Sequence, residues 1–171
     1  MSLKNFYSFE PGEALVVSEL RRVIPKSNAR DVEVFLPAKD VGVDVVLVNL
    51  VNKKSVSIQV KESVLYPKSR HFWFTIDEKK INVGKRIVDF YVFVLYDMIQ
   101  LSGKFSVHPR YVIVSEETFE GLLVKKKLAR GKYDFYFRLQ DDGSVVEERD
   151  FTIRYPDNCL DNWAPILNNA L

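Results

Sequence analysis

The chain has 171 residues, of which 47% are apolar and 28% charged, and this composition excludes disordered, collagen-like and disulfide-scaffold proteins. A chain of this length forms one ordinary domain that buries about 70% of its unfolded surface. Its single cysteine, Cys159, cannot form an internal disulfide, and the sequence shows neither an export signal nor an apolar segment long enough to span a membrane. We therefore expect one cytoplasmic, intracellular domain over residues 1–171.

Charge is distributed unevenly along the chain, although the net charge is only +2. Residues 1–133 contain 22 Lys and Arg and 15 Asp and Glu, a net charge of +7, whereas residues 134–171 contain 3 and 8, a net charge of −5. A basic body with an acidic C-terminal part suits a polyanionic ligand, and solvated surface charge gives the same pattern.

The first predicted element is an amphipathic helix over residues 12–24 that ends before Pro25. Its apolar residues recur at helical spacing: Val16, Val17, Leu20, Val23 and Ile24. Three runs rich in β-branched residues then predict strands over residues 32–36, 43–51 and 55–61, the last two joined by a hairpin turn at residues 52–54. Residues 43–51 are almost uniformly apolar, which favours a central strand buried on both faces.

The second half of the chain is expected to continue the sheet. A strand is predicted over residues 71–76, followed by a polar loop or short helix over 77–85. Two more strands are predicted over 89–96 and 111–114, separated by a Ser-Gly-Lys loop and His108-Pro109. A helix over 118–128, a hairpin over 133–153 around residues 141–143 and a closing helix over 160–167 complete the predicted elements. This order predicts an α/β (α+β) domain with a central mixed β-sheet flanked by helices.

Three common catalytic or binding motifs are absent from the sequence. The segment Ser102-Gly103-Lys104 resembles the end of a phosphate-binding loop, but Met98 replaces the leading glycine and Phe105 replaces the Ser or Thr. The two histidines lie 37 positions apart beside one cysteine, which excludes zinc-ligand spacing. No Gly-x-Ser-x-Gly elbow supports acyl chemistry.

Two further patterns have ordinary interpretations. The run Lys125-Lys126-Lys127 is more often the solvated face of a helix than a phosphate clamp. The aromatic strands around Trp73 and Phe135 could stack bases, but alternating aromatic residues are typical of strands that pack in a core.

Asp44 is the anomaly of the sequence, because an aspartate within an apolar strand must be desolvated at a cost or kept charged by a cation. If residues 52–54 close a tight hairpin, Asp44 lies opposite Lys61, and Gln59 shares their face. We expect Asp44, Gln59 and Lys61 to converge on one side of the sheet, provided that the register does not slip by one residue. A structural ion pair between Asp44 and Lys61 explains the same pattern as well as a functional site does.

The helix adds a carboxylate to this group. At about 100° per residue, Glu13 falls within the arc of the apolar stripe, whereas Glu19 falls on its flank. Glu13 is thus a candidate for the same site, and it also suits the electrostatics of a helix N-terminus without any catalytic role.

These residues resemble the pattern of the PD-(D/E)XK nuclease-like, or restriction-endonuclease-like, superfamily. The similarity lies in Gly12-Glu13, Gly42-Val43-Asp44 and Gln59-Val60-Lys61, within a helix, strand, hairpin and strand over residues 12–63. The resemblance implies an αβββαβ core with Glu13 as the helix acid, Asp44 as the metal-binding aspartate and Lys61 as the lysine that positions water and stabilises charge. Gln59 replaces the usual acid, as in a Gln-x-Lys variant, and this lowers the charge available to hold a metal.

The activity that the resemblance implies is hydrolysis of DNA phosphodiester bonds by a water bound to Mg²⁺ or Mn²⁺. The expected metal ligands are Asp44, Gln59, the Val60 carbonyl and Glu13 through a water. The expected partner is nucleic acid, DNA before RNA, without a membrane, and a homodimer is left open. The alternative is an inactive module with this fold that binds nucleic acid or a protein, while a small-molecule enzyme has no motif to support it. The acidic hairpin and helix of residues 134–171 complete the domain.

Overall fold

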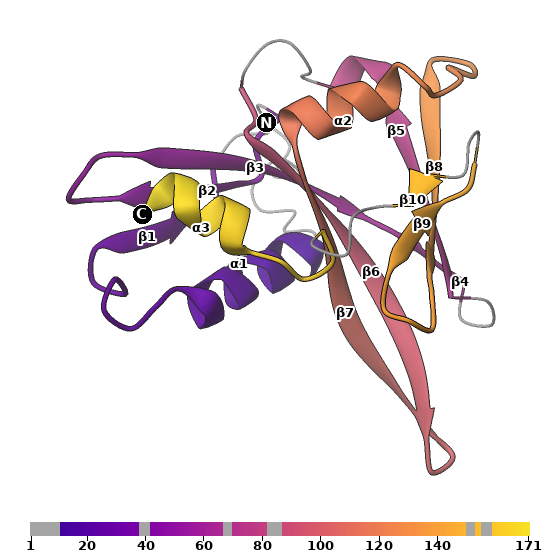
Figure 1. Ribbon diagram of the computed structural model, residues 1–171, viewed down its shortest axis with the longest axis horizontal. Coiled ribbons are helices and arrows are strands. Elements are labelled where there is room, and N and C mark those ends of the chain that lie inside the picture. The colour runs from indigo at the N-terminus through magenta and orange to yellow at the C-terminus, as the bar shows by residue number, and fades with distance from the viewer. Residues whose placement is uncertain (1–10, 38–41, 67–69, 82–86, 150–152, 155–158) are drawn as a thin grey trace, which may run out of the picture.

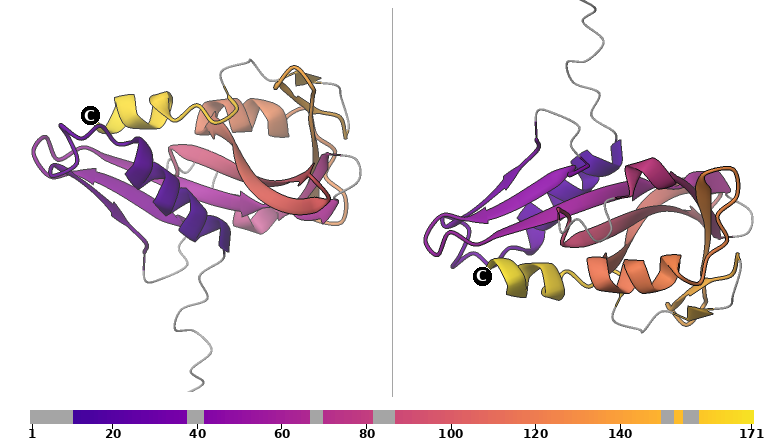
Figure 2. Two further views of the ribbon diagram at one scale, coloured as in Figure 1. Left: turned by 90° about the horizontal axis from the view of Figure 1, so that it is seen from below. Right: turned by 90° about the horizontal axis from the view of Figure 1, so that it is seen from above.

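Two five-stranded sheets and three α-helices form the described part of the computed structural model (Figure 1). The structure describes residues 11–37, 42–66, 70–81, 87–149, 153–154 and 159–171. Figure 2 shows α1 (Pro11–Val23) and α3 (Ala164–Ala170) at one end of the molecule and the second sheet at the other. The expected α+β architecture is confirmed.

The first sheet is mixed, with the strand order β1-β2-β3-β6-β7. Its strands are β1 (Val32–Phe35), β2 (Val45–Asn49), β3 (Ser55–Glu62), β6 (Phe90–Leu101) and β7 (Lys104–Ser115). Neighbours are antiparallel except β3 and β6, which are parallel. The central strand is therefore β3, and the prediction that residues 43–51 form the central strand was wrong. Strand β2 lies next to the edge, and its residues alternate between buried and half-buried.

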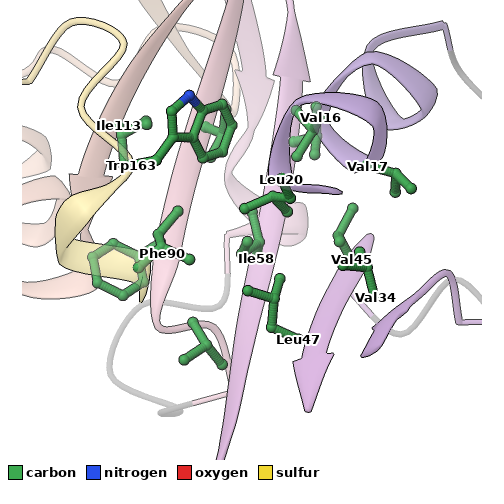
Figure 3. Packing of buried hydrophobic residues seen from close by; sticks show 14 of the residues in the cluster. Val16, Val17, Leu20, Val34, Val45, Leu47, Ile58, Phe90, Ile113 and Trp163 are labelled. Carbon is green, nitrogen blue, oxygen red and sulfur yellow. The ribbon is translucent and has the colours of Figure 1, made fainter. Parts of the chain in front are cut away.

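Helices α1 and α3 cover one face of the first sheet. The apolar stripe of α1, which includes Val16 and Leu20, packs on Ile58 of β3, while Phe90 of β6 and Trp163 lie beside α3 (Figure 3). The predicted helix over residues 12–24 is confirmed as α1, because its stripe buries against this sheet.

The second sheet is antiparallel, with the order β10-β9-β8-β5-β4. Its strands are β4 (Val64–Tyr66), β5 (His71–Asp77), β8 (Lys132–Leu139), β9 (Val145–Glu147) and β10 (Ile153–Arg154). With α2 (Glu116–Leu123) it encloses a second core rich in aromatic rings: Phe74, Phe93, Phe119, Phe135 and Phe137. The predicted hairpin around residues 141–143 is confirmed as β8 and β9.

The crossover from β3 to β6 differs from the core order that the resemblance implies. In place of a helix, the described part of this crossover contains β4, β5 and the 3-10 helix η2 (Glu78–Lys80). Strand β5 forms because Phe72, Phe74 and Ile76 alternate and bury one face. The strand over 71–76 was predicted from the sequence, and η2 is the short-helix alternative of the loop or short helix predicted after it.

Several predicted boundaries move. Helix α2 ends at Leu123 instead of residue 128, and the closing helix begins at Ala164, since Asp161 has a φ of 54°, which no helix continues through. Strands β6 and β7 run from Phe90 to Ser115 with only a two-residue turn between them, far beyond the predicted ranges. No helix in the described ranges is long and apolar enough to cross a membrane.

Candidate functional site

The register of the β2–β3 hairpin decides where the predicted site residues lie. Val45 pairs with Ile58 and Val48 with Ser55, and the Asn49 main-chain N–H donates to the Lys54 carbonyl at 2.9 Å. The turn therefore contains four residues, 50–53, and the pairing register of β2 with β3 differs by two residues from the predicted register. The prediction that Asp44 lies opposite Lys61 was wrong.

The longer turn has a local cause. The Asn49 side-chain oxygen accepts hydrogen bonds from the N–H groups of Val51 and Asn52, at 3.0 and 3.2 Å, and Lys53 adopts a φ of 61°. Asn side chains favour such turns because they bond to the main chain two residues on. Since the shift is by two residues, Gln59 and Lys61 keep the same face of the sheet relative to β2 that was predicted.

Asp44 lies where the regular pairing of β2 with β3 ends. Its main-chain N–H donates to the Ile58 carbonyl at 2.9 Å, and its Oδ2 accepts a hydrogen bond from the Val60 N–H at 2.6 Å. A carboxylate thus replaces the main-chain acceptor that a continued strand would supply, and hydrogen bonds to ionised acceptors are the stronger kind. Asp44 is fixed beside the β3 backbone between Gln59 and Lys61.

Gln59 is the most unusual polar residue near Asp44. Gln59 is only 4% exposed, and its Oε1 has no hydrogen-bond partner among the described residues. Leaving a buried acceptor without a partner costs about 1–3 kcal/mol, and stored strain, a catalytic role, or a water or ion explains such a group in native proteins. An amide oxygen is also an oxygen ligand of the kind that hard cations bind.

Lys61 lies next to this group on β3, and the fourth predicted residue, Glu13, lies on α1. Lys61 follows Gln59 by two residues on β3 and is half-buried, and Glu13 lies half-buried in the first turn of α1. The N–H of Gly12, the residue before Glu13, donates to Glu62 Oε1. This hydrogen bond connects the first turn of α1 to Glu62, the residue that follows Lys61 on β3.

Glu62 was not singled out from the sequence, although an acid directly after Lys61 is visible there. Its second oxygen, Oε2, accepts a hydrogen bond from the Tyr96 hydroxyl of β6 at 3.1 Å. Glu62 therefore links three elements, α1, β3 and β6, at the border of the site.

The donor set limits what this site can bind. Within the described ranges, no three His, Cys, Asp or Glu side chains converge in the manner of a metal site made from these ligands alone. A cation here would depend on the Asp44 carboxylate, the Gln59 amide oxygen and main-chain or water oxygens. These ligands suit Mg²⁺, which retains several waters and uses one or two carboxylates.

A buried ion pair lies away from this site. Lys126 and Glu147 are 1% and 0% exposed at their side chains, with 2.5 Å between Nζ and Oε1. Glu147 Oε1 also accepts hydrogen bonds from the N–H groups of Tyr136 and Arg149, both at 3.0 Å. The lysine run was predicted to be the solvated face of a helix, but it follows the end of α2. Lys125 and Lys127 are exposed as predicted, whereas Lys126 is buried because its side chain extends into the second core.

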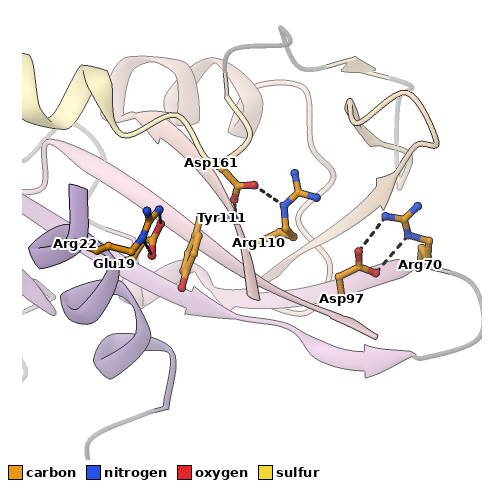
Figure 4. Close-up of polar contacts among 7 residues, drawn as sticks. All are labelled: Glu19, Arg22, Arg70, Asp97, Arg110, Tyr111 and Asp161. Carbon is orange, nitrogen blue, oxygen red and sulfur yellow. Dashed lines mark hydrogen bonds and ion pairs between the residues drawn. The ribbon is translucent and has the colours of Figure 1, made fainter. Parts of the chain in front are cut away.

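Other ion pairs follow the β6–β7 hairpin (Figure 4). Arg70 donates to Asp97 at 2.9 Å, and Arg110 donates to Asp161. Glu19 pairs with Arg22 at 2.5 Å, and that hydrogen bond lowers the pKa of Glu19. Each of these charged groups thus has an opposite charge beside it.

Tyr111 lies between these pairs. Burial, reinforced by the negative charges of Glu19 and Asp161, raises the pKa of Tyr111 to about 12. Its ring packs edge-on against Trp163, with 5.1 Å between ring centroids. Tyr111 therefore stays neutral at physiological pH and acts as part of the first core.

Comparisons with known proteins include a likeness to a solved structure. No family model and no curated protein matches this chain. Among solved structures, the chain is similar to a bacterial homing endonuclease, I-Ssp6803I, with a TM-score of 0.50 and 14% sequence identity over 91% of this chain and 86% of that chain. At this identity the likeness shows the fold alone, and the fold is nuclease-like.

Proposed function

We propose that this chain is a metal-dependent nuclease that hydrolyses phosphodiester bonds of DNA at Asp44, Gln59 and Lys61. The observation that carries the proposal is the buried Gln59 amide oxygen, which has no partner in the described structure and lies beside an anchored carboxylate. The likeness to a homing endonuclease supports the same activity, as does the Gln-x-Lys pattern of β3.

In the proposed mechanism, Mg²⁺ would be held by Asp44, Gln59, the Val60 carbonyl and Glu13 through a water. When bound, Mg²⁺ acidifies a coordinated water and offsets the charge that builds on the phosphate. The Lys61 ammonium donates a hydrogen bond beside the attacking oxygen, which is a preorganised electrostatic contribution to the transition state. The basic residues of the body would hold the DNA backbone, with a strong dependence on salt.

A second candidate function is an inactive nuclease-fold module that binds nucleic acid or a protein. It is favoured by Gln59 itself, because a neutral amide in place of a carboxylate reduces the charge that attracts a cation. The absence of three converging acidic or imidazole side chains within the described ranges points the same way. Metal uptake separates the two candidates.

The decisive experiment measures uptake of Mg²⁺ and Mn²⁺ by calorimetry together with cleavage of supercoiled DNA. We expect Asp44→Asn to lose both, since an amide retains the hydrogen bond from Val60 but not the charge. Asp89→Asn is the matched control, because Asp89 also accepts a hydrogen bond from a β3 main-chain N–H, that of Ser57, at 2.7 Å. If the wild-type protein takes up no metal at millimolar concentration, the inactive module is the better assignment.

Lys61→Ala tests the catalytic assignment itself. We expect it to abolish cleavage while metal uptake and melting temperature stay near wild type, because Lys61 is proposed to act on the reacting atoms. If Lys61 is instead the structural partner of Asp44, its removal leaves that carboxylate uncompensated and lowers the stability of the protein. A large fall in melting temperature with unchanged cleavage would overturn the catalytic role.

A further inference from the structure

The distal half of the β6–β7 hairpin extends beyond both sheets as a two-stranded ribbon (Figure 1). The pairing of β3 with β6 ends at Glu62 and Val94, whereas β6 and β7 stay paired as far as Leu101 and Lys104. We call residues 95–110 the arm; its base is buried at Leu95 and Asp97, and its exposed residues lie between Ile99 and His108. Among the described strands, β7 alone pairs with β6 along the arm.

The tip of the arm is a tight turn that extends the reach of the ribbon. Ser102 and Gly103 have φ values of 51° and 78°, as in the two-residue hairpin turns whose twist matches that of the strands. Such a turn adds no loop, so the ribbon stays narrow to its end.

The chemistry of the arm favours a polyanionic partner. The arm contains one acidic residue, Asp97, which pairs with Arg70, and Arg110 at its base pairs with Asp161. Lys104 at the tip is therefore the basic residue that the arm offers to a partner. The exposed polar side chains are Gln100, Ser102, Ser106 and His108, with His108 Nε2 and Ser106 Oγ 2.6 Å apart. Side chains of this kind form hydrogen bonds with phosphates and base edges.

We propose that the arm enters the major groove of double-stranded DNA that lies across the Asp44, Gln59 and Lys61 site. This inference rests on the proposed function and names its substrate as a duplex. A two-stranded β-ribbon fits the major groove of B-form DNA, which is about 12 Å wide. The major groove of an RNA duplex is too narrow for side chains to read, so DNA is the substrate that the arm suits.

The distance along β6 agrees with one continuous duplex. Lys61 pairs with Phe93 in the parallel register, and the last arm residue of β6, Leu101, lies eight residues further along the strand. At about 3.4 Å per residue, the tip lies about 27 Å from the site, which is less than the roughly 34 Å of one turn of DNA. A duplex at the site therefore reaches the arm within a single helical turn.

A second copy of this chain is the competing occupant, because Ile99 and Val107 are 38% and 51% exposed. Ile99 pairs with Ser106 and Val107 pairs with Met98, so the two apolar side chains lie on opposite faces of the ribbon. Ile99 and Val107 therefore do not merge into one exposed apolar patch of the kind that marks a protein interface. The observations thus favour DNA.

The test measures binding of a fluorescent duplex of about 20 base pairs, or two helical turns, in metal-free buffer by anisotropy over a salt series. Lys104→Gln should reduce the slope of log affinity against log salt by about 0.9, the value of one phosphate contact. Lys54→Gln, at an exposed lysine that directly follows the β2–β3 turn, is the matched control and should change the slope much less than Lys104→Gln does. A shortened arm, with residues 99–106 replaced by Asn-Gly, should lose about tenfold or more in affinity, because several backbone contacts disappear together.

Each result has a separate meaning for the arm and for the catalytic proposal. Duplex binding that is unchanged by both arm variants, or that the wild-type protein lacks, would overturn the inference. A shortened arm that converts a dimer into a monomer in sedimentation, with unchanged DNA binding, would assign the arm to a second copy. Metal uptake by the shortened variant, measured by calorimetry, should equal that of the wild type. If DNA binding depends on the arm but neither the wild-type protein nor the shortened variant takes up metal, the DNA-binding role of the arm stands and the proposed nuclease activity is refuted.

Discussion

At the scale of single residues, substitution of Gln59 gives the most specific prediction. Gln59→Glu should tighten Mg²⁺ binding, because hard cations respond to the number of charged ligands. Without metal, the same change buries a second carboxylate near Asp44, where the two negative charges repel each other. The expected signature is a lower melting temperature for the metal-free protein and a larger rise on adding Mg²⁺, as for a ligand that binds only the folded state.

Gln100→Glu is the control for this prediction, since Gln100 is an exposed glutamine on the arm and should not change the response to Mg²⁺. Calorimetric titration and thermal melting measure the two effects separately. If Gln59→Glu lowers stability and Mg²⁺ restores none of it, Gln59 does not face a cation, and the inactive module is the better assignment.

The buried pair of Lys126 and Glu147 supports a second prediction at this scale. Lys126→Ala should lower the free energy of unfolding by about 3–5 kcal/mol, because Glu147 would keep its burial and lose its counter-charge. Lys125→Ala, at an exposed position, should change it by less than about 0.5 kcal/mol. Urea denaturation of both variants measures the difference, and equal effects would contradict the assigned role of the pair.

At the scale of elements, the contact between α1 and β3 depends on the absence of a side chain at Gly12. A Cβ at this position would lie 2.6 Å from Glu62 Cγ and Oε1, so the Glu62 carboxylate would have to leave the helix N-terminus. Gly12→Ala should therefore destabilise the protein by about 1–3 kcal/mol, the usual cost of overpacking.

Gly121→Ala gives the opposite expectation for the same chemical change. Gly121 lies within α2, and a Cβ there meets no atom within 4 Å, so alanine should stabilise the helix by about 0.5–1 kcal/mol. Thermal unfolding of the two variants compares them directly. Similar effects from both substitutions would show that the contact of Gly12 with Glu62 does not hold α1 in place.

The elements that hydrophobic periodicity could predict are those whose burial is local. The stripe of α1 and the alternation of Phe72, Phe74 and Ile76 identify a helix and a strand without tertiary information. The β2–β3 register was not predictable in this way, because the side chain of Asn49 lengthens the turn and no apolar pattern records this. The length of β6 and β7 was missed because the arm is exposed, and exposed strands lack the alternation that burial imposes.

The site was predictable in part for the same reason. Asp44 was recognised because a charge in an apolar strand is anomalous, and Gln59 and Lys61 followed from their spacing on one strand. Glu62 was missed, since its role arises from contacts with Gly12 and Tyr96, which lie 50 and 34 residues away in the chain. Contacts between distant elements leave no periodic signal in one sequence.

At the scale of the whole molecule, β6 joins the two hydrophobic cores. Val92 and Val94 pack in the core beneath α1 and α3, while Tyr91, Phe93 and Leu95 pack in the aromatic core of the second sheet. Successive residues of a strand point to opposite faces, so one strand contributes its two faces to the two cores. If β6 separated from one core, its residues in the other core would also be exposed to water.

This sharing predicts a single cooperative unfolding transition, and the two tryptophans allow a direct test. Trp163 reports on the first core, and Trp73 reports on the second sheet, where it contacts Tyr136 with 5.5 Å between ring centroids. The variant Trp73→Phe retains only Trp163, and Trp163→Phe retains only Trp73. In each variant, the fluorescence of the remaining tryptophan and the circular dichroism should follow the same denaturation curve. Coincident curves from different probes are expected for a domain that unfolds in two states. Separate transitions would show that the sheets unfold independently. In that case, a variant that destabilises the second sheet, such as Lys126→Ala, would not destabilise the part of the protein that contains Asp44 and Gln59.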